Sequence, residues 1–255
     1  MILLLASLTL LPLQKKTDLH IIEPQTKLKL TFERDGKMDP KLWGFEDSPT
    51  VKILTEDQIK KARTGVQKCL SKYPPGFLRK FLDRIYICGD LKVGVVDYAG
   101  TYGERVLFLT FDEGYGGTAV QEFEATFHHE FSSLLMNARP KLFPDTAWRA
   151  ANAPGFRYRG YDNVYEAHGL DDAYEQKPEW LEEGFLIGYC RTSVEEDFNV
   201  LVEGIFGTTD NFWTTISEHP RIAKKVTLAM KFYSQLDPWF SAKRFRAFGK
   251  QAGTN

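Results

Sequence analysis

A stripe of apolar residues at helical spacing, in the middle of the chain, most strongly constrains what this sequence can fold into. Positions three and four apart share one face of a helix, and the stripe comprises Val120, Phe123, Phe127, Phe131 and Leu134. His129, Ser133 and Met136 fall roughly on the opposite face. We expect a long helix that begins near Thr118, where Thr118 and Gln121 fit a capping box. One face of this helix should lie in the core and the other should line a cleft.

The polar face of this helix carries part of a metal-binding motif. In H-E-x-x-H, two histidines at i and i+4 bind zinc, and the glutamate acts on the metal-bound water. His129 and Glu130 occupy the first two positions, but Ser133 stands where the second histidine belongs. A His-Glu pair alone is common by chance, so a polar patch on a partly buried helix would explain it equally well.

A second cluster downstream supports the interpretation that His129 and Glu130 belong to a metal site. Here a tyrosine, Tyr189, is followed seven residues later by a glutamate, Glu196. The other residues that match the motif are Arg191, Thr192 and Phe198. With its His-His-Glu-Phe helix, the chain resembles the gluzincin metallopeptidases related to anthrax lethal factor. It also resembles bacterial proteins assigned as candidate zinc-binding metallopeptidases. The resemblance covers about residues 105–205.

The resemblance implies a zincin-like fold and a role for each matching residue. His129 would be the first zinc ligand and Glu196 the third, while Glu130 would be the general base and Tyr189 the oxyanion donor. Each has a structural alternative. Ser193 and Glu196 also fit a capping box for the helix that follows, and Tyr189 could be a core residue with a solvated hydroxyl group.

Two departures from the family pattern bear on activity. Val200 occupies a position that is often acidic in the family, and Ser133 is a poor substitute for a histidine ligand, since catalytic zinc sites use His, Asp, Glu or Cys. Losing one ligand of four would cost about 3 kcal/mol, or roughly two decades of zinc affinity. We therefore expect zinc to bind weakly or not at all. Without zinc, Glu130 has no activated water to use.

Other groups could in principle replace the missing ligand. His128 points about 100° around the helix from His129 and cannot easily share its metal. His168, in an irregular segment, could fold over the cleft. A serine hydrolase using Ser132 or Ser133 with His129 is disfavoured, because a mid-helix serine lacks the strained turn and oxyanion donors of such enzymes.

The remaining patterns predict an α+β fold with a small mixed sheet packed on the motif helix. Apolar or alternating runs predict strands at 28–32, 84–88, 92–97 and 105–111, and a helix begins after Thr55. Residues 140–176 have no clear period and predict a long loop, and mainly helical sequence follows. We expect residues 18–255 to form one zincin-like domain.

Composition and the N-terminus bear on location and partners. The net charge is −1, from 33 basic and 34 acidic residues, so nothing suggests a nucleic-acid partner. Residues 1–17 include an apolar run too short to span a bilayer but suited to a signal peptide. No basic residue precedes this run and no small-x-small cleavage site follows it. We expect a leader and an exported protein without a stable membrane span in the mature chain.

The three cysteines, Cys69, Cys88 and Cys190, form no C-x-x-C pair, so a thiolate metal site is not expected. Three functional hypotheses remain. The first is an inactive relative of zinc peptidases whose cleft binds a peptide or protein. The second is an active hydrolase with an altered metal site. The third is an unrelated exported domain, in which His129 and Glu196 would lie far apart.

Overall fold

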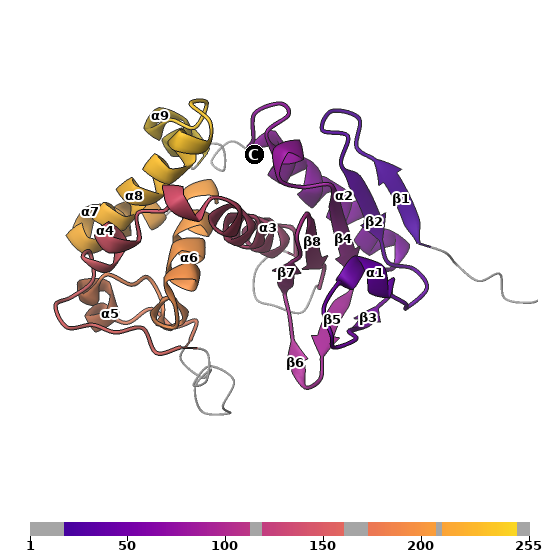
Figure 1. Cartoon of the computed structure of the whole chain (residues 1–255), viewed down its shortest axis with the longest axis horizontal. Coiled ribbons are helices and arrows are strands. Elements are labelled where there is room, and N and C mark those ends of the chain that lie inside the picture. The colour runs from indigo at the N-terminus through magenta and orange to yellow at the C-terminus, as the bar shows by residue number, and fades with distance from the viewer. Residues whose placement is uncertain (1–17, 113–118, 161–172, 208–210, 249–255) are drawn as a thin grey trace, which may run out of the picture.

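The computed structural model describes residues 18–112, 119–160, 173–207 and 211–248. Its sheet-containing half and its helical half lie on opposite sides of one long helix (Figure 1). The strands are β1 Leu19–Ile22, β2 Lys29–Phe32, β3 Thr50–Lys52, β4 Arg84–Cys88, β5 Asp90–Val93, β6 Val96–Asp97, β7 Gly100–Tyr102 and β8 Val106–Thr110. The α-helices are α1 Pro40–Trp43, α2 Glu56–Ser71, α3 Ala119–Ala138, α4 Asp145–Arg149, α5 Pro178–Glu183, α6 Val194–Phe206, α7 Phe212–Glu218, α8 Pro220–Leu236 and α9 Ala242–Phe248. The α+β prediction is confirmed.

The main sheet is mixed, as expected, and has the strand order β1-β2-β4-β8-β7. Its three central strands are parallel, whereas β1 and β7 run antiparallel to their neighbours at the two edges. Strands β3, β5 and β6 form a second, smaller sheet. The run predicted as one strand over 92–97 is instead a hairpin, because Gly94 turns the chain with a φ of 60°.

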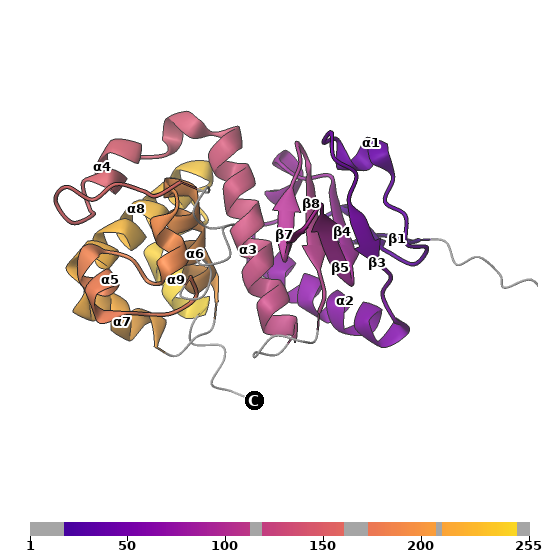
Figure 2. The ribbon, with the colours of Figure 1, turned by 90° about the horizontal axis from the view of Figure 1, so that it is seen from below.

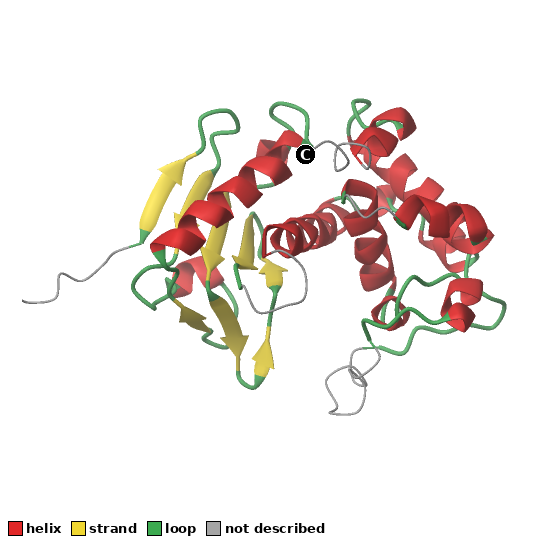
Figure 3. Ribbon diagram, turned by 180° about the vertical axis from the view of Figure 1, so that it is seen from behind, coloured by secondary structure: helices red, strands yellow, loops and turns green. Residues whose placement is uncertain are grey.

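Helices α2 and α3 pack against each other, and α3 lies between the sheet and the helical half (Figures 2 and 3). Thr55 and Gln58 form a reciprocal capping box that fixes the start of α2. The apolar stripe of α3 is buried as predicted: Phe123, Phe127 and Phe131 are at most 2% exposed. The expected capping box at Thr118 lies outside the described residues.

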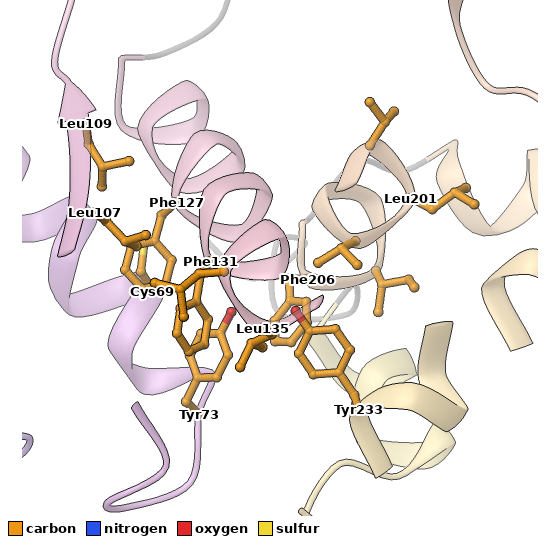
Figure 4. Packing of buried hydrophobic residues seen from close by; sticks show 14 of the residues in the cluster. Cys69, Tyr73, Leu107, Leu109, Phe127, Phe131, Leu135, Leu201, Phe206 and Tyr233 are labelled. Atoms are coloured by element: carbon orange, nitrogen blue, oxygen red, sulfur yellow. The ribbon is translucent and has the colours of Figure 1, made fainter. Parts of the chain in front are cut away.

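Helix α6 packs on the other side of α3, and the aromatic core continues across the boundary (Figure 4). Tyr73 of the sheet-containing half lies with its ring centroid 5.2 Å from Phe131 and 5.1 Å from Phe206 of α6. Phe206 in turn contacts Tyr233 of α8. One buried cluster therefore runs through both halves and holds α3 and α6 in a fixed mutual orientation.

A buried ion pair fixes the far side of α6. Lys225 of α8 lies 2.6 Å from Asp197 of α6, and both side chains are fully buried. The same carboxylate oxygen accepts hydrogen bonds from Trp148 Nε1 and the Tyr158 hydroxyl, while Lys225 also donates to the carbonyl of Gly184 at 2.7 Å. Because Asp197 follows Glu196 directly, this network sets which face of α6 is presented to α3.

The described parts of the segment 140–176 contain more regular structure than predicted. It contains a 3₁₀ turn at Pro140–Leu142 and the short helix α4, in which Trp148 is completely buried. Residues 161–172 lie outside the described part of the chain, including His168. Within the described residues, none of the helices combines the length and apolar character needed to cross a bilayer.

Gly204 provides a test of packing within the helical half. A Cβ atom on Gly204 would overlap the ring of Phe212. Alanine favours a helix by about 1 kcal/mol over glycine, but we expect Gly204→Ala to lower the free energy of unfolding by about 1–3 kcal/mol through overpacking. Urea denaturation measures this change. The loss should shrink in a Phe212→Leu background, and a stabilised single variant would contradict the packing described.

Candidate functional site

The site lies where polar faces of α3 and α6 meet inside an otherwise apolar interface. On α6, three residues at i, i+3 and i+7 share one face. Together with side chains of α3 they form an inter-helix polar cluster: His129, Ser132 and Ser133 from α3, and Glu196, Asn199 and Glu203 from α6. The hypothesis that would place His129 and Glu196 far apart does not agree with this geometry.

His129 is held between two carboxylates. Its Nε2 atom lies 2.9 Å from Glu196 Oε2, and its Nδ1 atom lies 2.5 Å from Glu203 Oε1. Burial acts to lower the pKa of His129, but the hydrogen bonds to Glu196 and Glu203 outweigh it, and the pKa is raised well above its ordinary value. Both carboxylates therefore favour the imidazolium form of the ring, through a hydrogen bond at Nδ1 and an ion pair at Nε2.

Ser133 is engaged by the facing helix. Asn199 Nδ2 donates to Ser133 Oγ at 2.6 Å, and Asn199 Oδ1 accepts from Ser132 Oγ at 2.5 Å. All three side chains are buried. We call this arrangement the Asn199 bridge. It satisfies polar groups whose burial without partners would cost about 1–3 kcal/mol each.

The donor set matches a zinc site only in part. His129 and Glu196 have the spacing of two ligands, and a carboxylate on the other ring nitrogen, here Glu203, is the usual outer support of a zinc-bound histidine. A third protein ligand is missing, because the Ser133 hydroxyl is a poor donor to zinc and already accepts from Asn199. The described residues at this position therefore do not complete a three-ligand catalytic zinc centre.

A different acidic group has three possible ligand atoms close together. Within the described residues, Asp18, Glu33 and Asp35 bring one oxygen each within 4.8 Å of one another. Glu33 is fully buried and accepts from the backbone N–H groups of Asp35 and Gly36 and from Tyr86. These contacts explain its position without a cation.

Glu130 lies beside strand β7, half-buried. A Cβ atom on Gly100 would stand 2.9 Å from Glu130 Cγ and 2.6 Å from Thr126, so the absence of a side chain at Gly100 lets the strand approach this part of α3. The pKa of Glu130 is raised to about 7, chiefly by burial and also by nearby carboxylates including Glu196, while His129 acts to lower it.

Tyr189 also lies at the site. It belongs to the 3₁₀ turn Gly188–Arg191, and its ring stacks on that of His129 at a centroid distance of 6.3 Å. Ser193 caps α6 by accepting from the backbone N–H of Glu196. Ser193 therefore acts as the helix cap, as the capping-box interpretation predicted. The side chain of Glu196 is directed to His129.

The other histidines have separate environments. His128 is fully buried, lies 2.8 Å from the Tyr73 hydroxyl and stacks on Phe206. Burial lowers the pKa of His128 to about 4, so this ring is a neutral core residue, as expected for a side chain that cannot share a metal with His129. His20 is on β1 and His219 is at the start of α8.

A cavity of about 550 Å³ opens beside the cluster. Its lining includes Ser133, Tyr102 of the edge strand β7, and Glu195 at the start of α6. The Tyr102 hydroxyl donates to Glu195 at 3.1 Å. The cavity thus joins the position of the absent histidine to β7, the edge strand of the main sheet in the described part of the chain.

Asn199 and Glu203 are the site residues that the sequence analysis missed. Their spacing from Glu196, by three and seven residues along one predicted helix, was the available signal. Val200, four residues after Glu196, packs in the apolar core.

Glu130→Gln tests the electrostatics of the site. The folded-state pKa of Glu130 is about 7 against an ordinary value of 4.5. The contribution of the protonated group to the free energy of unfolding is therefore complete below about pH 4.5 and is lost as the pH rises through 7. Glutamine stays neutral throughout. We expect the variant to match the wild type near pH 4.5 and to exceed its free energy of unfolding by about 3 kcal/mol near pH 8.

Urea denaturation at the two pH values measures this difference. Glu104→Gln, at an exposed position, is the matched control and should show no such pH-dependent gain. An equal difference between Glu130→Gln and the wild type at both pH values would contradict the raised pKa.

Comparison with known proteins gives one informative match. No family model matches the chain, and no curated protein matches it. A crystal structure from Bacteroides caccae, described as that of a candidate zinc-binding metallo-peptidase, aligns with a TM-score of 0.54 at 17% identity, covering 79% of this chain and 78% of that one. The chain therefore has a metallopeptidase-like fold.

Proposed function

We propose that this protein is a zincin-like binding module that does not hydrolyse peptides and holds a peptide or protein segment in its cleft. The Asn199 bridge carries the proposal, because it engages the hydroxyl group at the second ligand position and leaves no third zinc ligand on α3 or α6 at this point. The ion pair between His129 and Glu196 supports it, since the two candidate ligands bind each other directly. We further propose that the protein is exported.

The edge of the main sheet supports peptide binding. Gly103 donates to Val106 and Thr110 donates to Ala99 across the β7–β8 pair. Hydrogen bonding alternates along an antiparallel pair, so the backbone groups of Gly100 and Tyr102 point away from β8. An extended peptide could pair with these groups as an added strand.

An active hydrolase with an altered metal site is the second candidate. The raised pKa of Glu130, about 7, favours it, because a general base works best near the operating pH. His168 would then be a candidate substitute ligand; its position lies outside the described residues.

One experiment separates the two candidates. The protein is purified without chelator and dialysed, and its zinc content and its cleavage of a mixed peptide library are measured with and without added zinc. We expect far less than one zinc per chain and no cleavage. Stoichiometric zinc with turnover that is lost in Glu130→Gln would overturn the proposal and establish the hydrolase.

A further inference from the structure

The cavity beside Ser133 has a composition suited to one kind of side chain. Much of its wall is apolar, formed by Met136, Pro140, Phe143 and Val194, and Glu195 stands at its polar side. A histidine at position 133 would occupy part of this space. The serine therefore leaves an open cavity of about 550 Å³ next to the sheet edge.

The charges of the lining do not cancel. Arg149 is neutralised by Asp145, whose two oxygens lie 3.0 and 2.9 Å from Arg149 Nε. Glu195 accepts a hydrogen bond from Tyr102, but within the described residues no Lys, Arg or His lies within ion-pair distance of it. The cavity therefore retains one negative charge.

The surroundings add to this negative charge. Glu130 and Glu203 lie close by, and Glu203 pairs with His129. A bound group with a positive charge would lower the repulsion among these carboxylates, whereas a bound anion would increase it.

We propose that this cavity binds a lysine or arginine side chain of an extended peptide that pairs with β7, an inference that rests on the proposed function. Long cationic side chains place their methylene stem on apolar surface and their charged head at a polar rim. Here the stem would pack between Met136 and Val194, and the head would bind Glu195. Tyr102 links the peptide-binding strand to the cavity, because it belongs to the edge strand β7 and also lines the cavity.

The test uses three end-blocked heptapeptides that differ only in the central residue, which is lysine, norleucine or glutamate. Binding to the full chain is measured by isothermal titration calorimetry. We expect the lysine peptide to bind about tenfold more tightly than the norleucine peptide, as for a charge-assisted hydrogen bond, and the glutamate peptide to bind weakest. In Glu195→Gln the lysine preference should disappear.

Glu218→Gln, an exposed change at the end of α7, removes the same charge elsewhere and should retain the preference. Equal binding of the lysine and norleucine peptides would overturn the cavity assignment and leave peptide binding intact. A lysine preference that persists in folded Glu195→Gln would overturn the role of Glu195. No binding of any peptide would overturn both proposals.

Discussion

Replacing Lys225 with alanine should lower the free energy of unfolding by about 3–5 kcal/mol, as expected when one partner of a buried ion pair is removed. Both Lys225 and Asp197 are fully buried. Burial already lowers the pKa of Lys225 and raises that of Asp197, while each partner opposes the shift of the other. Without Lys225, the Asp197 carboxylate would be left in an apolar environment with only neutral donors, Trp148 and Tyr158.

Urea denaturation measures this effect, and two variants control for it. Lys224→Ala changes the exposed neighbouring residue and should alter stability by no more than about 0.5 kcal/mol. A Lys225→Met/Asp197→Leu double variant should recover most of the loss, because a buried ion pair can often be replaced by apolar side chains at little cost. A loss below about 1 kcal/mol in Lys225→Ala would mean that the pair is not buried as described.

The second large effect concerns zinc, and we expect a Ser133→His/Asn199→Ala double variant to bind about one zinc per chain. The new imidazole would supply the missing ligand, with a gain of about two decades in affinity. Ser133→His alone should bind less, because Asn199 Nδ2 lies only 2.6 Å from the Ser133 hydroxyl oxygen and would obstruct a larger side chain.

Elemental analysis after dialysis measures zinc, and competition with a chromophoric chelator measures the affinity. Asn199→Ala alone should stay near the wild-type level. Adding His129→Ala to the double variant should abolish binding, which excludes binding elsewhere, for example at Asp18, Glu33 and Asp35. One tightly bound zinc in the wild type would instead reveal a substitute ligand.

The sequence predicted the central helix well because its signal is local. Burial of Phe123, Phe127 and Phe131 follows from their spacing alone. Strands β1 and β7 escaped prediction because they are short edge strands; Gly100–Tyr102 resembles a turn, and its extended form depends on pairing with β8. Likewise, helix α4 has five residues and is held in place by the burial of Trp148.

The site was predictable only in outline. The family resemblance predicted that His129 and Glu196 lie close together. The local sequence around either residue does not specify this contact. Asn199 was missed because its partners are two serines on another helix. Its role depends on the rotation of α6 about its own axis, which the buried contacts of Asp197 help to set. Tertiary packing of this kind leaves no local periodicity to detect.

The Asn199 bridge has a consequence for how the two halves of the molecule stay joined. A junction held by a metal ion depends on the free ion concentration, exchanges with the surroundings and is dissolved by competing chelators. Here the connecting groups are the protein's own amide, hydroxyl and imidazolium groups. On the proposed function, the α3–α6 junction forms as part of folding, at fixed stoichiometry, and its integrity does not depend on metal supply.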